Sequence, residues 1–225
     1  MLKTMRNPLI LVANGDVNNL DWLKNALSRE SEAIIGVDGG TNYLLTIGII
    51  PDIVIGDLDS ISKEHLEQLR DNWVNIFQFN SEKDETDLEL ALLYAADQPQ
   101  WADTPIYIYG AQGGRLDHEI ANLMLLTHPK LAGKDVRLHA PHQTTFLILA
   151  TTEIHGRSGD TVSLIPLKGD AHIKQTQGLK WELSNSTLKF GPARGISNVM
   201  TASSSTVTVE SGLVLCIHTD REWQR

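Results

Sequence analysis

The first 140 residues alternate short apolar runs with segments of helical periodicity, and this alternation constrains the fold more than any other feature. Apolar runs typical of buried strands lie at 9–13, 33–37, 52–55, 75–79, 105–109 and 136–138. Segments with apolar residues at helical spacing lie at 21–29, 62–71, 86–96 and 116–126. Strands that alternate with helices indicate an α/β domain with a mostly parallel sheet flanked by helices, because parallel strands need long crossover connections.

The pattern changes after residue 140. Apolar and β-branched segments then recur at short intervals, with Gly, Pro, Asn and Ser between them and no long helical period. These segments are 145–148, 161–164, 179–183, 206–209 and 214–217. Such spacing predicts an all-β sandwich or barrel. We therefore predict two domains, residues 1–140 and residues 141–225.

Composition excludes several classes of protein. The chain has 225 residues, of which 41% are hydrophobic and 21% charged, so it can build a core and is not disordered. No apolar run reaches the roughly 18 residues that span a bilayer, which predicts no membrane segment. Residues 1–140 hold 11 Lys and Arg against 21 Asp and Glu, which argues against a nucleic-acid partner. The first residues lack a secretory pattern, and the lone Cys216 excludes an internal disulfide, so we expect a cytoplasmic protein.

Glycine beside Asp or Arg follows four of the predicted strands. The turns are Asn14-Gly15-Asp16, Asp38-Gly39-Gly40, Gly56-Asp57-Leu58-Asp59 and the glycine-rich stretch 110–118. A fifth element, Lys83-Asp84-Glu85-Thr86-Asp87, opens the helix at 86–96. Ligands of open α/β sheets bind outside the carboxyl ends of the strands, so we expect these five elements to line one site.

Asp57 and Asp59 indicate a site for a divalent cation. In extended chain, carboxylates at positions i and i+2 point to the same side, and they repel each other unless a cation lies between them. A hard divalent ion with oxygen ligands fits this pair, and Asp38 and Asp87 are expected at the same edge. The alternative for this pair is ordinary turn chemistry, in which Asp caps a turn. It also stays open whether Asp84, which could cap the helix, or Asp87 binds the metal.

Gly113, Gly114 and Arg115 precede a predicted helix and favour phosphate binding. Free backbone N–H groups at a helix start and a guanidinium group can bind one phosphate together. Asp117 and His118 follow in the first turn. The alternative is that they satisfy the helix N-terminus or pack locally.

In this order and spacing, the motifs resemble those of thiamine pyrophosphokinases. The motifs are Asp38-Gly39-Gly40, Gly56-Asp57-Leu58-Asp59-Ser60, Lys83-Asp84-Glu85-Thr86-Asp87 and Gly113-Gly114-Arg115-Leu116-Asp117-His118. In the second half, Gly178-Leu179-Lys180-Trp181-Glu182-Leu183 and Ser197-Asn198 resemble the thiamine-binding domain of that family. The likeness extends over about residues 10–218.

The resemblance implies transfer of pyrophosphate from ATP to the hydroxyl group of thiamine, which gives thiamine diphosphate and AMP. It also implies an α/β domain that binds ATP and Mg²⁺, a β-sandwich that contacts thiamine, and a homodimer whose subunits share each active site. The catalytic residues that it implies are Asp57, Asp59, Asp87, Arg115 and Asp117, of which Asp57, Asp59 and Asp87 would bind the metal. The ATP-binding residues would be Asn14, Gly15, Asp38, Gly39, Gly40, Lys83, Gly113, Gly114, Arg115 and His118. The thiamine-binding residues would be Trp181, Ser197 and Asn198.

Other functions stay open at this point. A pyrophosphokinase for a different alcohol, such as a hydroxymethylpterin, could use the same ATP-binding half. A regulatory module would bind the nucleotide without turnover, although its site would need fewer carboxylates. Trp181, without the resemblance, could equally be a core residue of the β-sandwich.

Overall fold

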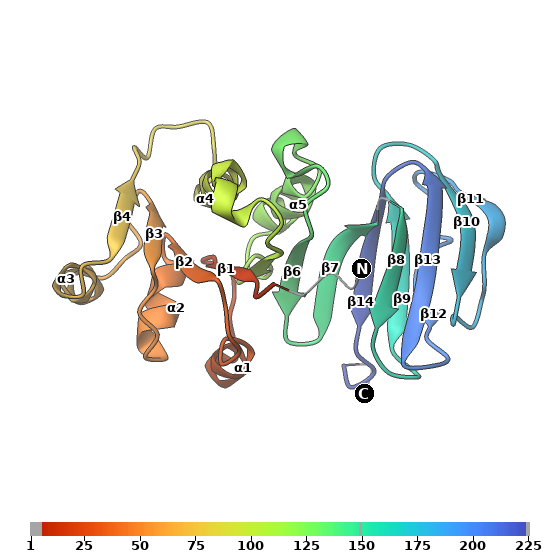
Figure 1. Cartoon of the computed structure of the whole chain (residues 1–225), viewed down its shortest axis with the longest axis horizontal. Coiled ribbons are helices and arrows are strands. Elements are labelled where there is room, and N and C mark those ends of the chain that lie inside the picture. Colours follow the sequence, from red (N-terminus) through yellow and green to blue (C-terminus); the bar gives the residue numbers. More distant parts are fainter. Residues whose placement is uncertain (1–5, 149, 224–225) are drawn as a thin grey trace. The chain divides into compact units, whose positions relative to one another are not determined.

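The computed structural model describes residues 6–148 and 150–223 of the chain (Figure 1). The chain divides into two compact units, Met1–Pro141 and His142–Arg225. Each unit is described by itself.

A parallel sheet forms the centre of the first unit. Its strands are β1 (Leu9–Val12), β2 (Ala33–Val37), β3 (Ile53–Gly56), β4 (Asn75–Gln78), β5 (Ile106–Tyr109) and β6 (Val136–Ala140), in the order β6-β5-β1-β2-β3-β4. Every pairing among these strands is parallel. The strand order reverses between β1 and β5. Such a reversal is the place at which open α/β sheets bind ligands.

Helices cover both faces of this sheet. They are α1 (Leu20–Ala26), α2 (Gly40–Thr46), α3 (Lys63–Asp71), α4 (Asp87–Asp97) and α5 (Leu116–Leu125), with short 3₁₀ turns at Pro99–Trp101 and Pro129–Leu131. In Figure 1, α1 and α2 lie on one side of the sheet and α4 and α5 on the other. The predicted α/β architecture is therefore confirmed. Among the described helices, none combines the length and the apolar character needed to cross a bilayer.

Helix α2 does not follow from the sequence pattern. It has seven residues and begins directly after Gly39, with no side chain that caps its first turn. The residues Gly39, Gly40 and Thr41 at its start have low helix propensity, and a glycine pair is typical of a turn. Strand β1, in contrast, does follow from the sequence pattern. All four of its residues are apolar and buried, as expected for a strand covered on both faces.

His139 in β6 makes the first unit sensitive to acid. Its ring stacks on that of Tyr109, with centroids 5.3 Å apart, and meets Tyr107 edge-on at 4.7 Å. Burial lowers the pKa of His139 to about 4, and the charge of Arg137 acts in the same direction. A histidine in the unfolded chain has a pKa near 6.5. As the pH falls, His139 is therefore protonated in the unfolded chain before it is protonated in the folded protein, and this favours unfolding.

We expect the stability supplied by neutral His139 to be lost as the pH falls from about 6.5 toward 4. Between pH 7 and pH 5, the free energy of unfolding of the native protein should fall by about 2 kcal/mol more than that of His139→Phe. Urea unfolding at the two pH values measures this difference. An unchanged pH dependence in His139→Phe would contradict the expectation.

The second unit consists of two antiparallel sheets. Its strands are β7 (Gln143–Ile148), β8 (Thr151–His155), β9 (Thr161–Pro166), β10 (Ala171–Gln177), β11 (Ser184–Leu188), β12 (Asn198–Val199), β13 (Ser204–Ser211) and β14 (Val214–Thr219). One sheet has the order β12-β9-β14-β7 and the other the order β11-β10-β13-β8. The all-β prediction is confirmed.

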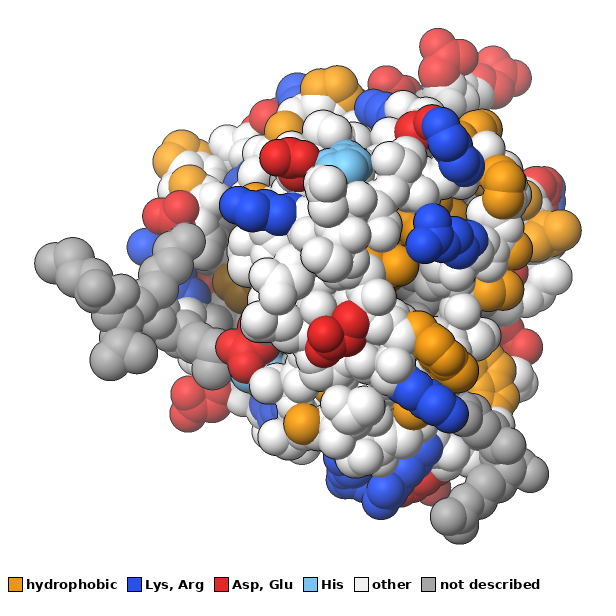
Figure 2. Space-filling model, turned by 90° about the vertical axis from the view of Figure 1, so that its right-hand side faces the viewer, with side chains coloured by type: hydrophobic (Ala, Val, Ile, Leu, Met, Phe, Trp, Pro, Cys, Tyr) orange, Lys and Arg blue, Asp and Glu red, His pale blue; other side chains and the backbone are white. Residues whose placement is uncertain are grey.

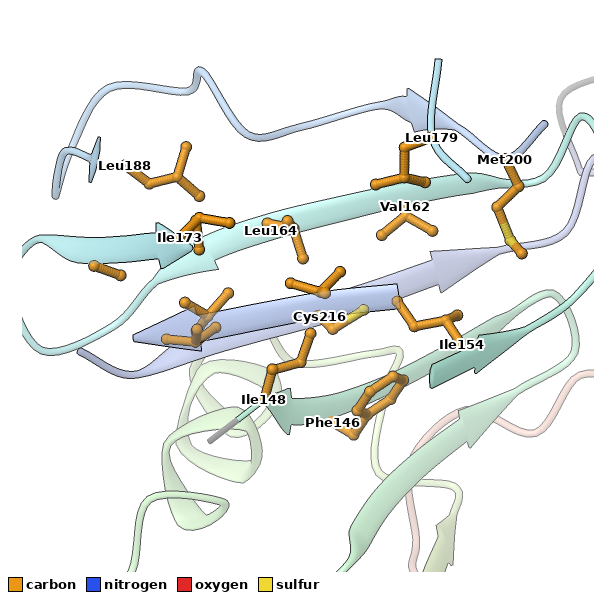
Figure 3. Packing of buried hydrophobic residues seen from close by; sticks show 14 residues of the cluster. Phe146, Ile148, Ile154, Val162, Leu164, Ile173, Leu179, Leu188, Met200 and Cys216 are labelled. Atoms are coloured by element: carbon orange, nitrogen blue, oxygen red, sulfur yellow. The ribbon is translucent and has the colours of Figure 1, made fainter. Parts of the chain in front are cut away.

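A single apolar layer lies between these two sheets, which makes the unit a sandwich (Figure 3). Phe146 and Cys216 from one sheet and Ile154 and Ile173 from the other belong to this cluster. Cys216 is fully buried within it. Figure 2 shows acidic and basic side chains interspersed over one face of the molecule, with hydrophobic side chains among them. Buried residues alternate with partly exposed ones along β9 and along most of β13. Apolar inside and polar outside is the usual alternation of an antiparallel sandwich.

One strand expected from the sequence is absent from the structure. Residues 179–183 form a turn with a single bridge, between Leu179 and Met200, rather than a strand. Gly178 begins this turn with φ +74°, a conformation that glycine adopts without strain. The apolar pattern misled here because Leu179 is buried while Trp181 points into solvent.

Candidate active site

The loops that follow β1 and β5 are joined at the point where the strand order reverses. The Gly15 N–H donates to the Gly110 carbonyl at 2.6 Å, and the Asp16 N–H donates to the Gln112 carbonyl at 3.0 Å. A Cβ atom on Gly15 would lie 2.4 Å from the Gly110 oxygen, so only glycine permits this approach. The Tyr43 hydroxyl, on α2, donates to the Gly15 carbonyl at 3.0 Å. These contacts fix one wall of a cavity.

The ends of β2 and β3 bring Asp38 and Asp57 together. Asp38 has φ +44°, a conformation that is uncommon outside glycine and that Asp tolerates better than most residues. Its N–H donates to the Ile55 carbonyl at 2.8 Å. A Cβ atom on Gly56 would lie 2.8 Å from the Cβ of Asp38, so glycine is required for the two loops to meet.

Asp38, Asp57 and Asp87 form a group that we name the carboxylate cluster. One oxygen of each lies within 4.8 Å of the others. Asp87 is the first residue of α4, whose N-cap is Thr86; the Thr86 hydroxyl accepts from the Glu89 N–H at 3.2 Å. Two residues that follow strands and one at the start of a helix thus meet at the carboxyl edge of the sheet, as expected from the sequence.

The cluster has the electrostatics of a cation site. Burial raises the pKa of Asp87, and the charges of Asp38 and Asp57 raise it further, while Lys83 opposes this shift. Asp38 is 8% exposed, and its buried Oδ1 atom has no hydrogen-bond partner within the described part of the chain. A buried carboxylate oxygen without a donor is costly unless a cation satisfies it. The donor set therefore fits Mg²⁺.

Lys83 supplies positive charge to the cluster. Its Nζ atom lies 3.0 Å from Oδ1 of Asp87, four residues further along the chain. The side chain of Lys83 is 14% exposed and that of Asp87 is 24% exposed. Its two side chains are less exposed than those of the ion pairs Lys130–Asp97 and Lys189–Asp170.

Asp59 and Asp84 lie outside the carboxylate cluster. Leu58 has φ +70°, so the chain from Asp57 to Asp59 is a turn and not the extended segment assumed from the sequence. Asp57 Oδ1 accepts from the Asp59 N–H at 3.1 Å, while Asp59 Oδ1 accepts from the Ser60 hydroxyl at 2.9 Å. Asp57 thus both accepts the hydrogen bond of this turn and belongs to the carboxylate cluster. Asp84 is exposed and does not cap α4, because the helix begins three residues later.

The glycine-rich loop before α5 is held by that helix. The Gly113 N–H donates to a carboxylate oxygen of Glu119, and Asn122 donates to the Ala111 carbonyl at 2.8 Å. Arg115 and Asp117 form an exposed ion pair at 2.5 Å. This hydrogen bond from Arg115 lowers the pKa of Asp117 to about 2. The Arg115 guanidinium is therefore engaged locally, although it borders the cavity.

These elements enclose a cavity of about 780 Å³ in the first unit. The predicted residues that line it are Asn14, Gly15, Asp38, Asp57, Asp59, Lys83, Asp87, Gly113, Gly114, Arg115 and His118. Gly39, Gly40 and Asp117 are not among its lining residues. Gly40 packs against β1 instead, since a Cβ atom there would lie 2.1 Å from the Val12 carbonyl oxygen.

Other lining residues were not selected from the sequence. They include Tyr43, Glu119 and Asn122. Glu119 and Asn122 lie three residues apart on α5, a spacing that puts two polar side chains on one helix face and could have indicated them. Tyr43 gave no such signal, because the helix that carries it was not predicted.

In the second unit, Trp181 and Asn198 form one structural element. The Trp181 N–H donates to Asn198 Oδ1 at 3.0 Å, and Asn198 Nδ2 donates back to the Trp181 carbonyl at 2.6 Å. Trp181 is 56% exposed, so it is not a core tryptophan. The Lys180 ammonium lies 4.8 Å from the centroid of its ring. Ser197, with φ +58°, donates its N–H to the Ser163 hydroxyl at 3.0 Å.

Comparison with known proteins agrees with this two-unit arrangement. Residues 24–138 match the family model "Thiamin pyrophosphokinase, catalytic domain", and residues 148–214 match "Thiamin pyrophosphokinase, vitamin B1 binding domain". The chain belongs to the thiamin pyrophosphokinase family.

Individual relatives cover the same span. The thiamine pyrophosphokinase of Bacillus subtilis (strain 168) is 32% identical over 211 residues, which are 92% of this chain and 96% of that protein. A crystal structure of thiamine pyrophosphokinase from Bacillus subtilis superposes with a TM-score of 0.83 at 30% identity, covering 95% and 99% of the two chains. The thiamin pyrophosphokinase structure from Geobacillus thermodenitrificans gives a TM-score of 0.81 at 28% identity, covering 94% and 97%. The family predicted from the motifs is therefore confirmed.

The two family models divide the chain where the structure does. The catalytic-domain model lies within the first unit, which holds the cavity and the carboxylate cluster. The vitamin B1 binding model covers the turn of Trp181 and the segment of Asn198 in the second unit.

Proposed function

We propose that this member of the thiamin pyrophosphokinase family is an enzyme that transfers the pyrophosphoryl group of ATP to the hydroxyl group of thiamine, giving thiamine diphosphate and AMP. The carboxylate cluster at the reversal of strand order is the observation that carries the proposal. Family membership over both units supports the choice of substrates.

The carboxylate cluster would hold Mg²⁺ through Asp38, Asp57 and Asp87. The ion, when bound, neutralises charge on the phosphate oxygens and thereby favours attack on phosphorus. Asp38 and Asp57 are placed by the ends of neighbouring strands, and Asp87 by a capped helix, so their positions are set before any ligand arrives. Such preorganisation is how a protein promotes phosphoryl transfer without forming a covalent intermediate.

The glycine loops would bind the polyphosphate. Gly113 and Gly114 both have positive φ and line the cavity just before the start of α5, where backbone N–H groups can bind an anion once the Gly113 N–H leaves the Glu119 carboxylate. Lys83, Arg115 and His118 border the same space and supply donors. In-line attack at the β-phosphorus by the thiamine oxygen would then release AMP. Asp59, which lines the cavity outside the cluster, is a candidate to orient that hydroxyl group.

The second unit would bind thiamine through Trp181, supported by Ser197 and Asn198. Thiamine is a flat cation, and the exposed face of an indole ring suits such a group. Asn198 holds the Trp181 backbone by hydrogen bonds in both directions, so we assign it a positioning role.

Product analysis tests the reaction. The protein is incubated with ATP, Mg²⁺ and thiamine, and the nucleotides are separated. We expect AMP and thiamine diphosphate in equal amounts. ADP would indicate an ordinary kinase, AMP formed only with a hydroxymethylpterin would indicate another pyrophosphokinase, and ATP binding without turnover would indicate a regulatory module.

Replacing Trp181 by Ala should act on thiamine and not on ATP. We expect the KM for thiamine to rise by about tenfold or more, because an aromatic face over a cation contributes on the order of 1–2 kcal/mol. The KM for ATP should stay within about twofold, since Trp181 belongs to the other unit. Steady-state kinetics with each substrate varied in turn give both values, and Trp223→Ala, an exposed tryptophan of the same unit, is the matched control. A selective rise in the KM for ATP would contradict this division.

We also propose a homodimer in which each active site combines the first unit of one subunit with the second unit of its partner. Helix α5 carries Leu116, Ile120 and Met124, which are 68%, 48% and 47% exposed. They recur every four residues and form one apolar stripe on a helix without a buried residue. Such a stripe is typical of a surface that another protein covers.

Mixing two impaired variants tests the shared site, at a thiamine concentration far below the KM of Trp181→Ala, where that variant is nearly silent. Asp57→Asn and Trp181→Ala subunits are unfolded together and refolded, or coexpressed. If sites are shared, half of the dimers are mixed and each contains one intact site, so about a quarter of native activity should return. No recovery in mixed dimers verified by mass spectrometry would show that each site lies within one subunit.

A further inference from the structure

The ammonium group of Lys83 lies against the carboxylate cluster. Its Nζ atom is 3.0 Å from Oδ1 of Asp87, and only 14% of the side chain is exposed. A lysine side chain normally keeps its strongly hydrated ammonium group in water. Its partial withdrawal into the cavity therefore reflects attraction by the carboxylates.

The charge balance of the cluster explains this attraction. Asp38, Asp57 and Asp87 bring up to three negative charges within 4.8 Å, and Lys83 is the basic residue paired with them in the described chain. One ammonium leaves most of this charge uncompensated. A divalent cation compensates more of it and needs the same Asp87 carboxylate, so the two cations compete for one partner.

The local structure allows Lys83 to move while Asp87 stays in place. Asp87 is fixed at the start of α4 by the Thr86 cap. Lys83 lies in the connection before that helix, on a flexible four-carbon stem, and borders the same cavity. Its ammonium group can leave Asp87 and remain within the cavity.

We propose that Lys83 is the internal counterion of the carboxylate cluster: it pairs with Asp87 in the metal-free protein, and a divalent cation displaces it. Lys83 therefore lowers the affinity of the site for the ion and prevents repulsion among the carboxylates before the ion binds. The displaced ammonium is then free to face the polyphosphate. This inference rests on the proposed cation site and gives Lys83 a role distinct from simple phosphate binding.

Binding of Mn²⁺ in the absence of nucleotide tests the proposal. Free Mn²⁺ is measured by electron paramagnetic resonance during titration of the native protein and of Lys83→Gln, Lys83→Met, Lys83→Arg and Lys63→Gln. We expect the two neutral Lys83 variants to bind Mn²⁺ about tenfold more tightly than the native protein. Lys83→Arg keeps the charge, and Lys63→Gln removes an exposed charge on α3, so both should stay within about twofold of the native protein.

A second measurement is the thermal unfolding of the same proteins. The metal-free Lys83→Gln protein should melt at a lower temperature than the native protein, and Mn²⁺ should raise its melting temperature by more. A residue that only contacts phosphate would leave the Mn²⁺ affinity of the nucleotide-free protein unchanged.

The outcomes separate this inference from the cation site itself. If the native protein binds Mn²⁺, Asp57→Asn abolishes that binding, and the neutral Lys83 variants bind no more tightly, then the counterion role is wrong and the cation site stands. An equal gain in affinity in Lys63→Gln would also overturn the role, because it would reflect net charge alone. Absence of Mn²⁺ binding to the native protein would overturn both.

Discussion

Asp57→Asn and Asp38→Asn are expected to lower kcat by at least about 100-fold while the protein stays folded. Loss of one carboxylate from the cluster removes charge that would hold Mg²⁺, and several kcal/mol of transition-state stabilisation correspond to such a factor. Asparagine preserves the rest of each position. It tolerates the positive φ of Asp38, and its oxygen can still accept from the Asp59 N–H in place of Asp57. Steady-state kinetics of the purified variants measure kcat, and circular dichroism shows whether they are folded.

Two further variants sharpen this experiment. Asp71→Asn removes an equal charge from an exposed position at the end of α3 and should leave kcat unchanged. Asp59→Asn should reduce kcat less than Asp57→Asn, because Asp59 lies outside the carboxylate cluster. Near-native turnover by both cluster variants would remove these residues from the proposed metal site. A loss in Asp59→Asn equal to that in Asp57→Asn would extend the site to Asp59.

Gly40→Ala is expected to destabilise the first unit by about 3 kcal/mol or more. A Cβ atom at this position would lie 2.1 Å from the Val12 carbonyl oxygen and 2.6 Å from the Val12 carbonyl carbon. Both atoms belong to the backbone of a fully buried strand, so neither can move aside cheaply, and overpacking of this kind is among the more costly single substitutions. A loss of this size lowers the melting temperature of a chain this long by roughly 10 °C.

Gly48→Ala is the matched control for this substitution. A Cβ atom on Gly48 meets no other atom within 4 Å, although the residue has φ +81°. Only the backbone strain of a left-handed alanine remains, about 1 kcal/mol. Thermal unfolding of both variants should therefore separate steric contact from conformational preference. Equal melting temperatures for the two variants would show that α2 can shift away from β1 without cost.

The strand ends were the most predictable part of the site. Asp38, Asp57 and the glycine loop each follow an apolar run, and the parallel sheet of the structure brings these turns into one cavity. Short-range patterns suffice here because the direction of a parallel strand decides at which edge its last residue lies. Asp87 rather than Asp84 joins the cluster because the helix begins at Asp87 with Thr86 as its N-cap, a boundary that the sequence leaves uncertain by a few residues.

The contacts that refine the site were not predictable from local pattern. Leu58 adopts a left-handed conformation, so the chain turns between Asp57 and Asp59, and the residue type of Leu58 does not predict this turn. Asn198 fixes the backbone of Trp181 from seventeen residues further along the chain. The helix that carries Tyr43 begins at Gly40, directly after Gly39, and has no capping side chain, so the local sequence indicates a turn. Each of these features depends on a tertiary contact, which overrides the local preference of the residues involved.

The reversal of strand order between β1 and β5 has a consequence for synthesis of the chain. By the end of α4 at Asp97, a growing polypeptide already contains every member of the carboxylate cluster, but the wall supplied by β5 and its glycine loop has not yet been made. A fragment of the chain ending there contains all three carboxylates yet lacks the second wall of the cavity. Binding of ATP by a growing chain would therefore indicate that β1, already paired with β2, has also paired with β5.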